Sequence, residues 1–310
     1  MTQNDLSNIP VSIRHVTKKY ADGFEAVRNV SFQIKRGDFS VLMGLNGAGK
    51  TSLIGMLTGT NHVSAGSIEV FGSDITKDPI RAKIKLGVVP QEVNLNFFTP
   101  IMDTLIYHGG FFGIPKHTVI QRALPLLKKA RLDKKIHLPA GSLSGGMKRM
   151  LMLIRALIQK PEILVLDEPT ANLDIEIRRT IWDILRTEHQ NGMTTLLTTH
   201  NLEEAQLLCT NVLILHHGKL VMDRTLEDAI EEMEEKFYTI KFSSAPQKRA
   251  LESFSAYGAK LKGEKTVDFC ITRSQDLGQL IYKLHLAGLK IDHIAPSSHQ
   301  LEQLLTEAIL

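Results

Sequence analysis

Several short runs of the chain consist mostly of apolar residues or threonine and show no strict alternation between polar and apolar positions. They lie at residues 39–43, 163–167, 194–199 and 212–215. Runs of this length without alternation are typical of strands that are buried on both faces of a parallel sheet. Helical segments such as residues 175–189 lie between them. The pattern predicts an α/β fold whose core is a parallel sheet wound with helices.

The segments before and inside this core follow other patterns. Short strands are expected around residues 11–17, 30–34 and 67–71, and glycine turns separate them. They predict an antiparallel β subdomain that flanks the parallel core. From about residue 94 to 160, apolar positions recur at three- and four-residue spacing, which predicts a helical subdomain. Pro125 interrupts this stretch, and we expect a kink or a helix restart there.

Four phenylalanines lie within the helical stretch. Two interpretations are open for them: aromatic side chains of the core, which is our expectation, or a groove that faces a partner. The four are Phe97, Phe98, Phe111 and Phe112.

The composition changes after residue 219. Strands are expected at residues 237–242 and 267–272, and helices at 246–257, 277–286 and 300–310. These elements predict a small C-terminal α+β domain that has no chemical motif of its own. A cluster of acidic residues before it predicts a connecting helix with a solvated face rather than a binding site. Its members are Glu227, Asp228, Glu231, Glu232, Glu234 and Glu235.

Length and composition agree with a chain of two globular domains. A length of 310 residues predicts about two domains, which we expect at residues 1–230 and 231–310. The hydrophobic content of 43% is that of a globular protein. No run approaches the roughly 18 apolar residues of a membrane helix, and residues 1–10 are polar without a signal-peptide core. We therefore expect a cytoplasmic protein and expect any membrane-spanning part to be another chain.

The cysteine count argues against a disulfide-stabilised or cysteine-ligated metal protein, and the charge balance argues against a nucleic-acid-binding protein. Cys209 and Cys270 are too few for a disulfide framework and lack the spacing of metal ligands, so both are expected to be reduced thiols. Lys plus Arg exceeds Asp plus Glu by only four, 37 minus 33. A nucleic-acid partner is not expected, because such partners usually need a dense basic face.

The segment at residues 44–51, Gly-Leu-Asn-Gly-Ala-Gly-Lys-Thr, directly follows the first apolar run and leads into a helix. This context indicates a phosphate-binding P-loop, in which bare backbone N–H groups and the helix dipole attract phosphate. We expect Lys50 to reach the β- and γ-phosphates and Thr51 to bind Mg²⁺. The alternative is a turn that merely starts a helix, and a P-loop alone leaves GTPases, kinases and ATPases open. The nucleotide-binding residues expected here are Gly44, Asn46, Gly47, Ala48, Gly49, Lys50, Thr51 and Ser52.

Two carboxylates end the apolar run at residues 163–167. Asp167 and Glu168 precede a proline, and the carboxyl ends of parallel strands are where open α/β sheets place their ligands. We expect Asp167 to hold the Mg²⁺ shell and Glu168 to accept a proton from the attacking water. The alternative is a strand that ends in a solvated acidic turn.

A third motif, Leu-Ser-Gly-Gly at residues 143–146, lies between the other two. With the P-loop, Asp-Glu-Pro and a downstream histidine, it makes the chain resemble the ATP-binding subunits of ATP-binding-cassette (ABC) transporters. The resemblance covers about residues 11–230 in unbroken motif order. Leu45 replaces a usual proline without removing a phosphate ligand. Met147 replaces a usual glutamine, which puts only contacts of that side chain in doubt.

The resemblance implies roles for further residues. Tyr20 matches the aromatic residue that stacks on adenine, and Gln91 matches the glutamine that touches Mg²⁺ and the attacking water. His200 matches the contact to the γ-phosphate. Asp174 closes a loop, Ala-Asn-Leu-Asp at residues 171–174, that links the two sites of a dimer. The residues implied to bind the γ-phosphate held by the opposite subunit are Ser144, Gly145 and Gly146.

The resemblance also implies cofactors and partners. It implies MgATP bound between two nucleotide-binding domains, a homodimer because each motif occurs once, and a separate integral-membrane permease. The chain would then lie on the cytoplasmic face of the membrane. The C-terminal domain resembles the extension of ABC-2-type exporter ATPases, a group that serves drug, polysaccharide and Nod-factor export and includes the YadG-like proteins. The transported substrate is not encoded in such a chain.

Three alternatives stay open at this point. One is a soluble ABC ATPase that acts on ribosomes or DNA, although such proteins usually carry two cassettes or a long coiled-coil insertion. Another is an importer ATPase with a regulatory C-terminal domain, which only the C-terminal resemblance disfavours. The third is a nearly inactive binding module, which the presence of Lys50, Asp167, Glu168 and His200 disfavours.

Overall fold

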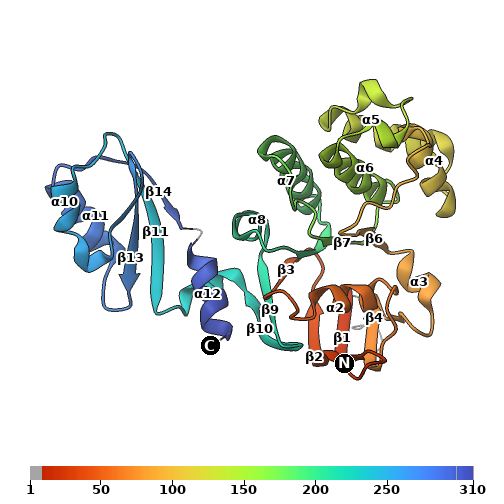
Figure 1. The fold of residues 1–310 in the computed structure, drawn as a ribbon, viewed down its shortest axis with the longest axis horizontal. Coiled ribbons are helices and arrows are strands. Elements are labelled where there is room, and N and C mark those ends of the chain that lie inside the picture. The colour runs from red at the N-terminus through yellow and green to blue at the C-terminus, as the bar shows by residue number, and fades with distance from the viewer. Residues whose placement is uncertain (1–8, 298, 310) are drawn as a thin grey trace. The chain divides into compact units, whose positions relative to one another are not determined.

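Three β-sheets organise the chain (Figure 1). The computed structural model describes residues 9–297 and 299–309, so part of the polar N-terminal stretch and the last residue of the expected C-terminal helix lie outside the described residues. The chain divides into two units between Arg224 and Thr225, slightly before the boundary at residue 230 that the sequence predicts.

A six-stranded sheet forms the centre of the first unit. Its strand order is β10-β9-β3-β8-β7-β6, and the pairs from β9 to β6 are parallel. Every residue of β3, β7 and β8 is buried, the threonines of β8 included, which explains why these strands show no alternation between polar and apolar positions. The α/β fold with a parallel core is thereby confirmed. The strands are β3 (Phe39–Met43), β6 (Leu86–Val89), β7 (Ile163–Asp167), β8 (Thr194–Thr198), β9 (Asn211–His216) and β10 (Lys219–Thr225).

A smaller antiparallel sheet lies beside this core. Its order is β2-β1-β4-β5, with β1 (Val11–Lys19) paired to both β2 (Glu25–Ile34) and β4 (Ala65–Val70). The short β5 (Ser73–Asp74) and the helix α3 (Pro79–Lys83) follow. The three strands that the sequence predicts here are confirmed. The strands β1 and β2 are longer than expected, whereas β4 begins before residue 67 and ends at Val70, before the expected end at residue 71.

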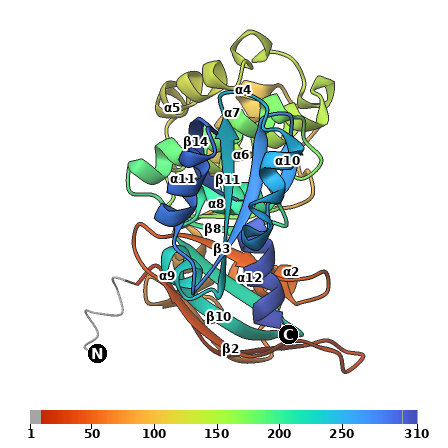
Figure 2. The same ribbon diagram turned by 90° about the vertical axis from the view of Figure 1, so that its left-hand side faces the viewer.

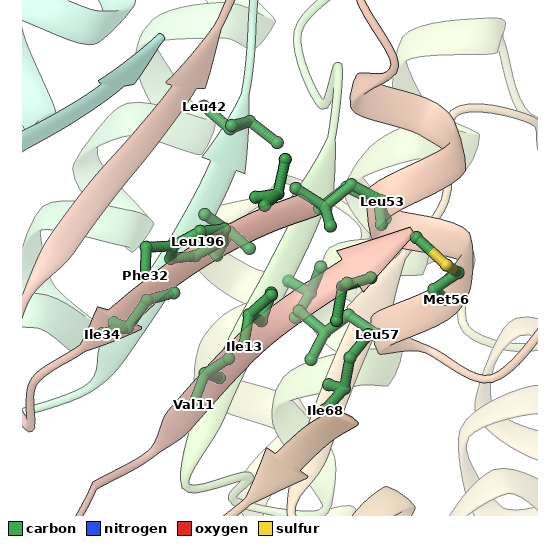
Figure 3. Packing of buried hydrophobic residues seen from close by; sticks show 14 of the residues in the cluster. Val11, Ile13, Phe32, Ile34, Leu42, Leu53, Met56, Leu57, Ile68 and Leu196 are labelled. Atoms are coloured by element: carbon green, nitrogen blue, oxygen red, sulfur yellow. The ribbon is translucent and has the colours of Figure 1, made fainter. Parts of the chain in front are cut away.

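One hydrophobic cluster joins the two sheets through helix α2 (Lys50–Leu57). Leu53 and Leu57 of this helix pack with Ile13 and Ile68 of the antiparallel sheet and with Leu196 of the parallel sheet (Figure 3). All five side chains are at most 1% exposed. Burying a leucine or isoleucine stabilises a fold by about 1.5–3 kcal/mol, so this cluster fixes the helix that follows the P-loop.

The helical segment contains α4 (Ile101–Phe111), α5 (Lys116–Lys129) and α6 (Gly145–Ile158), with the short 3₁₀ turns Asp133–Lys135 and Ala140–Ser142 between the last two. The sequence predicts a kink or a helix restart at Pro125, and the restart is wrong, because α5 continues through this residue. A proline removes only one backbone hydrogen bond, and Ala123 and Leu127 on either side are fully buried and keep the helix in place.

The phenylalanines of this segment do not form a core. Phe98 is 92% exposed, Phe111 is 88% exposed and Phe97 is 46% exposed, while Phe112 is half-buried. The core prediction is therefore wrong for three of the four. The buried face of α4 consists of other residues, Ile101, Thr104, Leu105 and Gly109.

The second unit is a four-stranded antiparallel sheet with the order β12-β13-β11-β14. Two helices, α10 and α11, supply the leucines that pack on one face with Ile240 and Phe269 (Figure 1, Figure 2). Strands and helices alternate as β-α-β-β-α-β, which is the split βαβ topology. Its elements are α9 (Leu226–Glu231), β11 (Glu235–Phe242), α10 (Lys248–Glu252), a 3₁₀ turn at Ser255–Tyr257, β12 (Lys260–Gly263), β13 (Thr266–Thr272), α11 (Leu277–Leu286), β14 (Ile291–Pro296) and α12 (His299–Ile309).

Three expectations for this unit need correction. The acidic helix ends at Glu231, and Glu235 is already the first residue of β11. The helix expected at residues 246–257 is a short helix followed by a 3₁₀ turn. Strands β12 and β14 were not predicted, because they are edge strands with few buried residues. Across the described residues, no helix has the length and hydropathy required to span a membrane.

Candidate functional site

The glycine-rich loop turns sharply between β3 and α2. Gly47 and Gly49 have φ angles of +81° and +106°, a left-handed conformation that glycine adopts without strain. A Cβ on Gly49 would lie 2.3 Å from the carbonyl oxygen of Ala26, so no larger residue fits. Lys50 and Thr51 are the first two residues of α2, with Gly49 as the N-cap. Leu45 is 58% exposed, so leucine in place of proline leaves the loop's packing unchanged.

The ammonium group of Lys50 lies over this loop. Its Nζ donates hydrogen bonds to the carbonyl oxygens of Gly44 (2.7 Å) and Leu45 (3.2 Å). Partial burial lowers the pKa of Lys50, while attraction to Glu168 and Asp167 raises it. The ammonium group of Lys50 is therefore held between the loop and the two carboxylates, next to the backbone of the glycine-rich loop.

Strand β8 positions the two carboxylates at the end of β7. The hydroxyl of Thr198 donates a hydrogen bond to Asp167 Oδ1 and accepts one from the backbone N–H of Glu168 at 3.1 Å. Asp167 is only 7% exposed. Glu168 has a φ of +50°, a conformation that non-glycine residues adopt at a cost and that is concentrated at functional sites.

Glu168 and His200 form a direct contact. The Nδ1 atom of His200 lies 2.7 Å from Oε2 of Glu168. The side chain of Glu168 is 12% exposed and that of His200 is 72% exposed, so the pair lies where β7 and β8 end at the surface. The structure thus brings two of the three predicted catalytic residues together, on the same edge of the sheet as the glycine-rich loop.

Arg149 of α6 holds the segment that contains Gln91. Its guanidinium donates hydrogen bonds to the carbonyl oxygens of Pro90 (2.6 Å) and Gln91. Burial lowers the pKa of Arg149, and the nearby Asp167 and Glu168 raise it. Gln91 itself is exposed and lies two residues after the end of β6. Arg149 was not predicted, although a single arginine on the apolar face of a helix is a signal for such a role.

Tyr20 lies beside the start of α2. Its hydroxyl is 3.0 Å from Ser52 Oγ, and Lys18 Nζ lies 4.8 Å from the centre of its ring. The side chain is 39% exposed. A partly exposed aromatic ring next to the phosphate loop is a suitable surface for stacking a base.

Comparisons with known proteins agree with this geometry. The ABC transporter family model matches residues 27–171. A Nod factor export ATP-binding protein I of Burkholderia thailandensis is 38% identical over 226 residues, which are 73% of this chain and 74% of that protein. The chain belongs to the ATP-binding family of ABC transporters.

Solved structures of ABC ATP-binding subunits have the same fold. One ATP-binding subunit of an ABC transporter superposes with a TM-score of 0.68 and 25% identity, over 72% of this chain and 92% of the other. A dimeric ATP-binding cassette in a post-hydrolysis state, bound to ADP and Pi, gives a TM-score of 0.65 at 25% identity, over 70% of this chain and 98% of the other. The chain is therefore an ABC ATPase that binds ATP.

The remaining predicted residues of this ABC ATPase start two helices. Ser144 Oγ accepts a hydrogen bond from Met147 N (3.3 Å) and caps α6, while Asp174 Oδ1 accepts one from Ile177 N (3.0 Å) and caps α7 (Ile175–Gln190). Ser144 is exposed, and so is the neighbouring Gly145. In the described part of the chain, neither helix start is hydrogen-bonded to the glycine-rich loop. Gly146 packs tightly, since a Cβ there would lie 2.4 Å from Ile177 Cδ1.

Proposed function

We propose that the chain is the MgATP-hydrolysing subunit of an exporter and drives a separate membrane permease. The observation that carries this proposal is the 2.7 Å contact between Glu168 and His200 at the sheet edge next to the P-loop. A carboxylate at this place can accept a proton from water, and a histidine beside it can orient the groups that react.

Each predicted site residue has a role in the proposal. Lys50 neutralises the β- and γ-phosphates, while the backbone around Gly47 and Gly49 surrounds them. Glu168 accepts the proton of the attacking water, and His200 holds Glu168 and contacts the γ-phosphate. Tyr20 stacks on the base, and Gln91 orients the water.

The residues also fit a magnesium ion. Hard oxygen donors are what Mg²⁺ prefers, and Thr51 and Asp167 present a hydroxyl and a carboxylate near the phosphate site. The hydroxyl of Thr198 occupies one oxygen of Asp167 and leaves its other oxygen for the ion's water shell. Bound there, the ion neutralises charge on the transferred phosphoryl group. Gln91 is the further residue proposed to touch it.

The two helix starts point to a dimer. Ser144, Gly145 and Asp174 use their hydrogen bonds to cap or start helices and leave exposed surface there. The positive end of α6 is suited to binding a phosphate. We propose that this phosphate is the γ-phosphate of ATP held by a second copy of the chain. The dimeric cassette among the solved relatives supports this arrangement.

The exposed aromatic residues of the helical segment suit the permease. Phe111 lines a hollow of about 270 Å³ together with Asn96, Thr99 and other residues. Phe98 is 92% exposed and directly precedes Thr99 in the chain. Large apolar side chains gathered at a surface mark interaction sites. The relatives named for Nod factor export support an export partner, in which the transported compound would be bound by the permease.

Co-purification from membranes tests the proposal. We expect a tagged chain, isolated in mild detergent, to retain an integral-membrane protein. A chain with both Phe98→Ser and Phe111→Ser should lose it, whereas Leu286→Ser, an equally apolar surface change at 67% exposure, should not. Recovery of ribosomal proteins in place of a membrane protein would favour the ribosome-acting alternative.

A further inference from the structure

Glu204 is a fully buried carboxylate that none of the proposed catalytic steps uses. It lies in α8 (Leu202–Leu208) and is 0% exposed. Its Oε1 atom accepts two hydrogen bonds of 2.9 Å, one from the hydroxyl of Thr170 and one from the indole N–H of Trp182. Its Oε2 atom has no hydrogen-bond partner of normal geometry among the described residues.

The partners of Glu204 come from positions next to the two catalytic residues and from helix α7. Thr170 is two positions after Glu168, and Trp182 lies in α7, the helix that begins after Asp174. Thr199 immediately precedes His200 and also approaches the carboxylate. The Thr199 hydroxyl accepts a hydrogen bond from Asn201 N (3.0 Å), which leaves its own proton free to donate.

The carboxylate is costly to bury at this place. Burial raises the pKa of Glu204, and so does the negative charge of Glu168, whereas hydrogen bonds from Thr199, Trp182 and Thr170 lower it. An apolar side chain of similar size would fill the same space without this cost. A leucine, however, could not accept the hydrogen bonds that Thr170 and Trp182 donate from two different segments to one oxygen of Glu204.

We propose that Glu204 is a positioning residue for hydrolysis, which ties the loop after Glu168, the helix α7 and the end of β8 into one arrangement. The inference rests on the proposed ATPase function of Glu168 and His200. The Thr170 contact restrains Glu168 two positions before it. Thr199, the residue directly before His200, restrains this histidine from the other side through its hydrogen bond to Glu204, so a third carboxylate holds the 2.7 Å contact between the two catalytic side chains.

The sharpest variant removes one hydrogen bond and keeps the shape. Thr170→Val leaves Glu204 and Trp182 untouched but ends the link to the catalytic loop. We expect kcat to fall about ten- to hundredfold, because small displacements of catalytic groups have effects of this size, while KM for ATP stays within about twofold. Thr195→Val is the control, since Thr195 is an equally buried threonine of β8 that precedes Thr199 by four positions.

The only tryptophan of the chain reports on the same carboxylate. Trp182 emission should be unchanged in Thr170→Val but shifted in Glu204→Leu, which removes the indole's acceptor. Glu204→Gln retains an oxygen that can accept both hydrogen bonds. It should therefore keep kcat within about threefold of wild type, and its Trp182 emission should match that of wild type rather than the shifted emission of Glu204→Leu.

Each outcome separates the two claims. If wild type hydrolyses ATP and Thr170→Val matches its kcat, the positioning role is wrong and the ATPase function stands. A purely structural role predicts a lower melting temperature with an unchanged kcat of the folded protein, and that result would also overturn the inference. If folded wild type and the Thr195→Val control both lack hydrolysis with MgATP, the proposed function fails, and the positioning role for it fails too.

Discussion

His200 Nδ1 approaches Glu168 Oε2 to 2.7 Å although the two residues come from different strands of the central sheet. Glu168 follows β7 and His200 follows β8, and these strands are parallel neighbours. Their carboxyl ends therefore meet at one edge, which is where ligands of open α/β sheets bind. The contact with His200 therefore fixes the carboxylate of Glu168 at the sheet edge that also carries the phosphate-binding loop.

Replacement of Lys50 by alanine should weaken ATP binding without unfolding the protein. Within residues 9–297 and 299–309, the hydrogen bonds of its Nζ go to carbonyl oxygens of the loop and not to a core side chain. Hydrogen bonds to charged groups contribute about 1.5–3 kcal/mol, so affinity should fall roughly ten- to hundredfold. Isothermal titration with ATP measures this, with Lys134→Ala as an exposed control. Wild-type affinity in folded Lys50→Ala would contradict the P-loop assignment.

Two glycines of the loop should differ in their tolerance of alanine. Both have positive φ, but a Cβ on Gly47 meets open space, whereas one on Gly49 would clash with Ala26 O at 2.3 Å. Gly47→Ala carries only the left-handed penalty of about 1–2 kcal/mol. Gly49→Ala should lower the melting temperature further, because backbone must move. Equal melting temperatures for the two variants would show that the clash is relieved without cost.

The elements that could be predicted from the sequence are those whose structure depends on neighbouring residues. The buried strands at 39–43 and 163–167 match the structure, because strands covered on both faces are apolar throughout. The P-loop was readable because a glycine turn between a strand and a helix uses local backbone conformation. In the second unit, α11 was predicted with its bounds of Leu277–Leu286.

The residues whose roles could not be predicted are those that depend on contacts with distant parts of the chain. Thr198, Arg149 and Glu204 organise the site through partners that are 30 or more positions away in most cases, and nothing in the neighbouring sequence marks those partners. Phe98 and Phe111 were expected in the core because aromatic side chains are often buried. Phe98 lies in a turn before α4 and Phe111 is the last residue of α4, and the burial of both depends on which distant segments pack against them.

Removal of the second unit tests the two-domain proposal. A cut near Glu235, at the end of the acidic cluster, would fall at the start of β11, where Glu235 pairs with Thr272. A chain ending at Arg224 follows the division of the structure and retains every proposed ATP-site residue. We expect it to fold and bind ATP, because the second unit has a separate hydrophobic core. Loss of folding would contradict two independent domains.

The same truncated chain tests a role for the second unit in pairing. We propose that this unit strengthens the dimer and so raises turnover at low protein concentration. ATPase rate plotted against protein concentration should then be displaced to higher concentration for the chain ending at Arg224. Superimposable curves for the two forms would rule out the pairing role and favour a partner-binding or purely structural one.

The most direct test of the account is ATP turnover by Glu168→Gln. The amide is nearly isosteric with the carboxylate but cannot accept the proton of the attacking water, so kcat should fall by about two to four orders of magnitude. ATP binding should persist, and the variant should accumulate as an ATP-bound dimer in size-exclusion chromatography. Hydrolysis at the wild-type rate under saturating MgATP would remove Glu168 from the role of base and contradict the proposed mechanism.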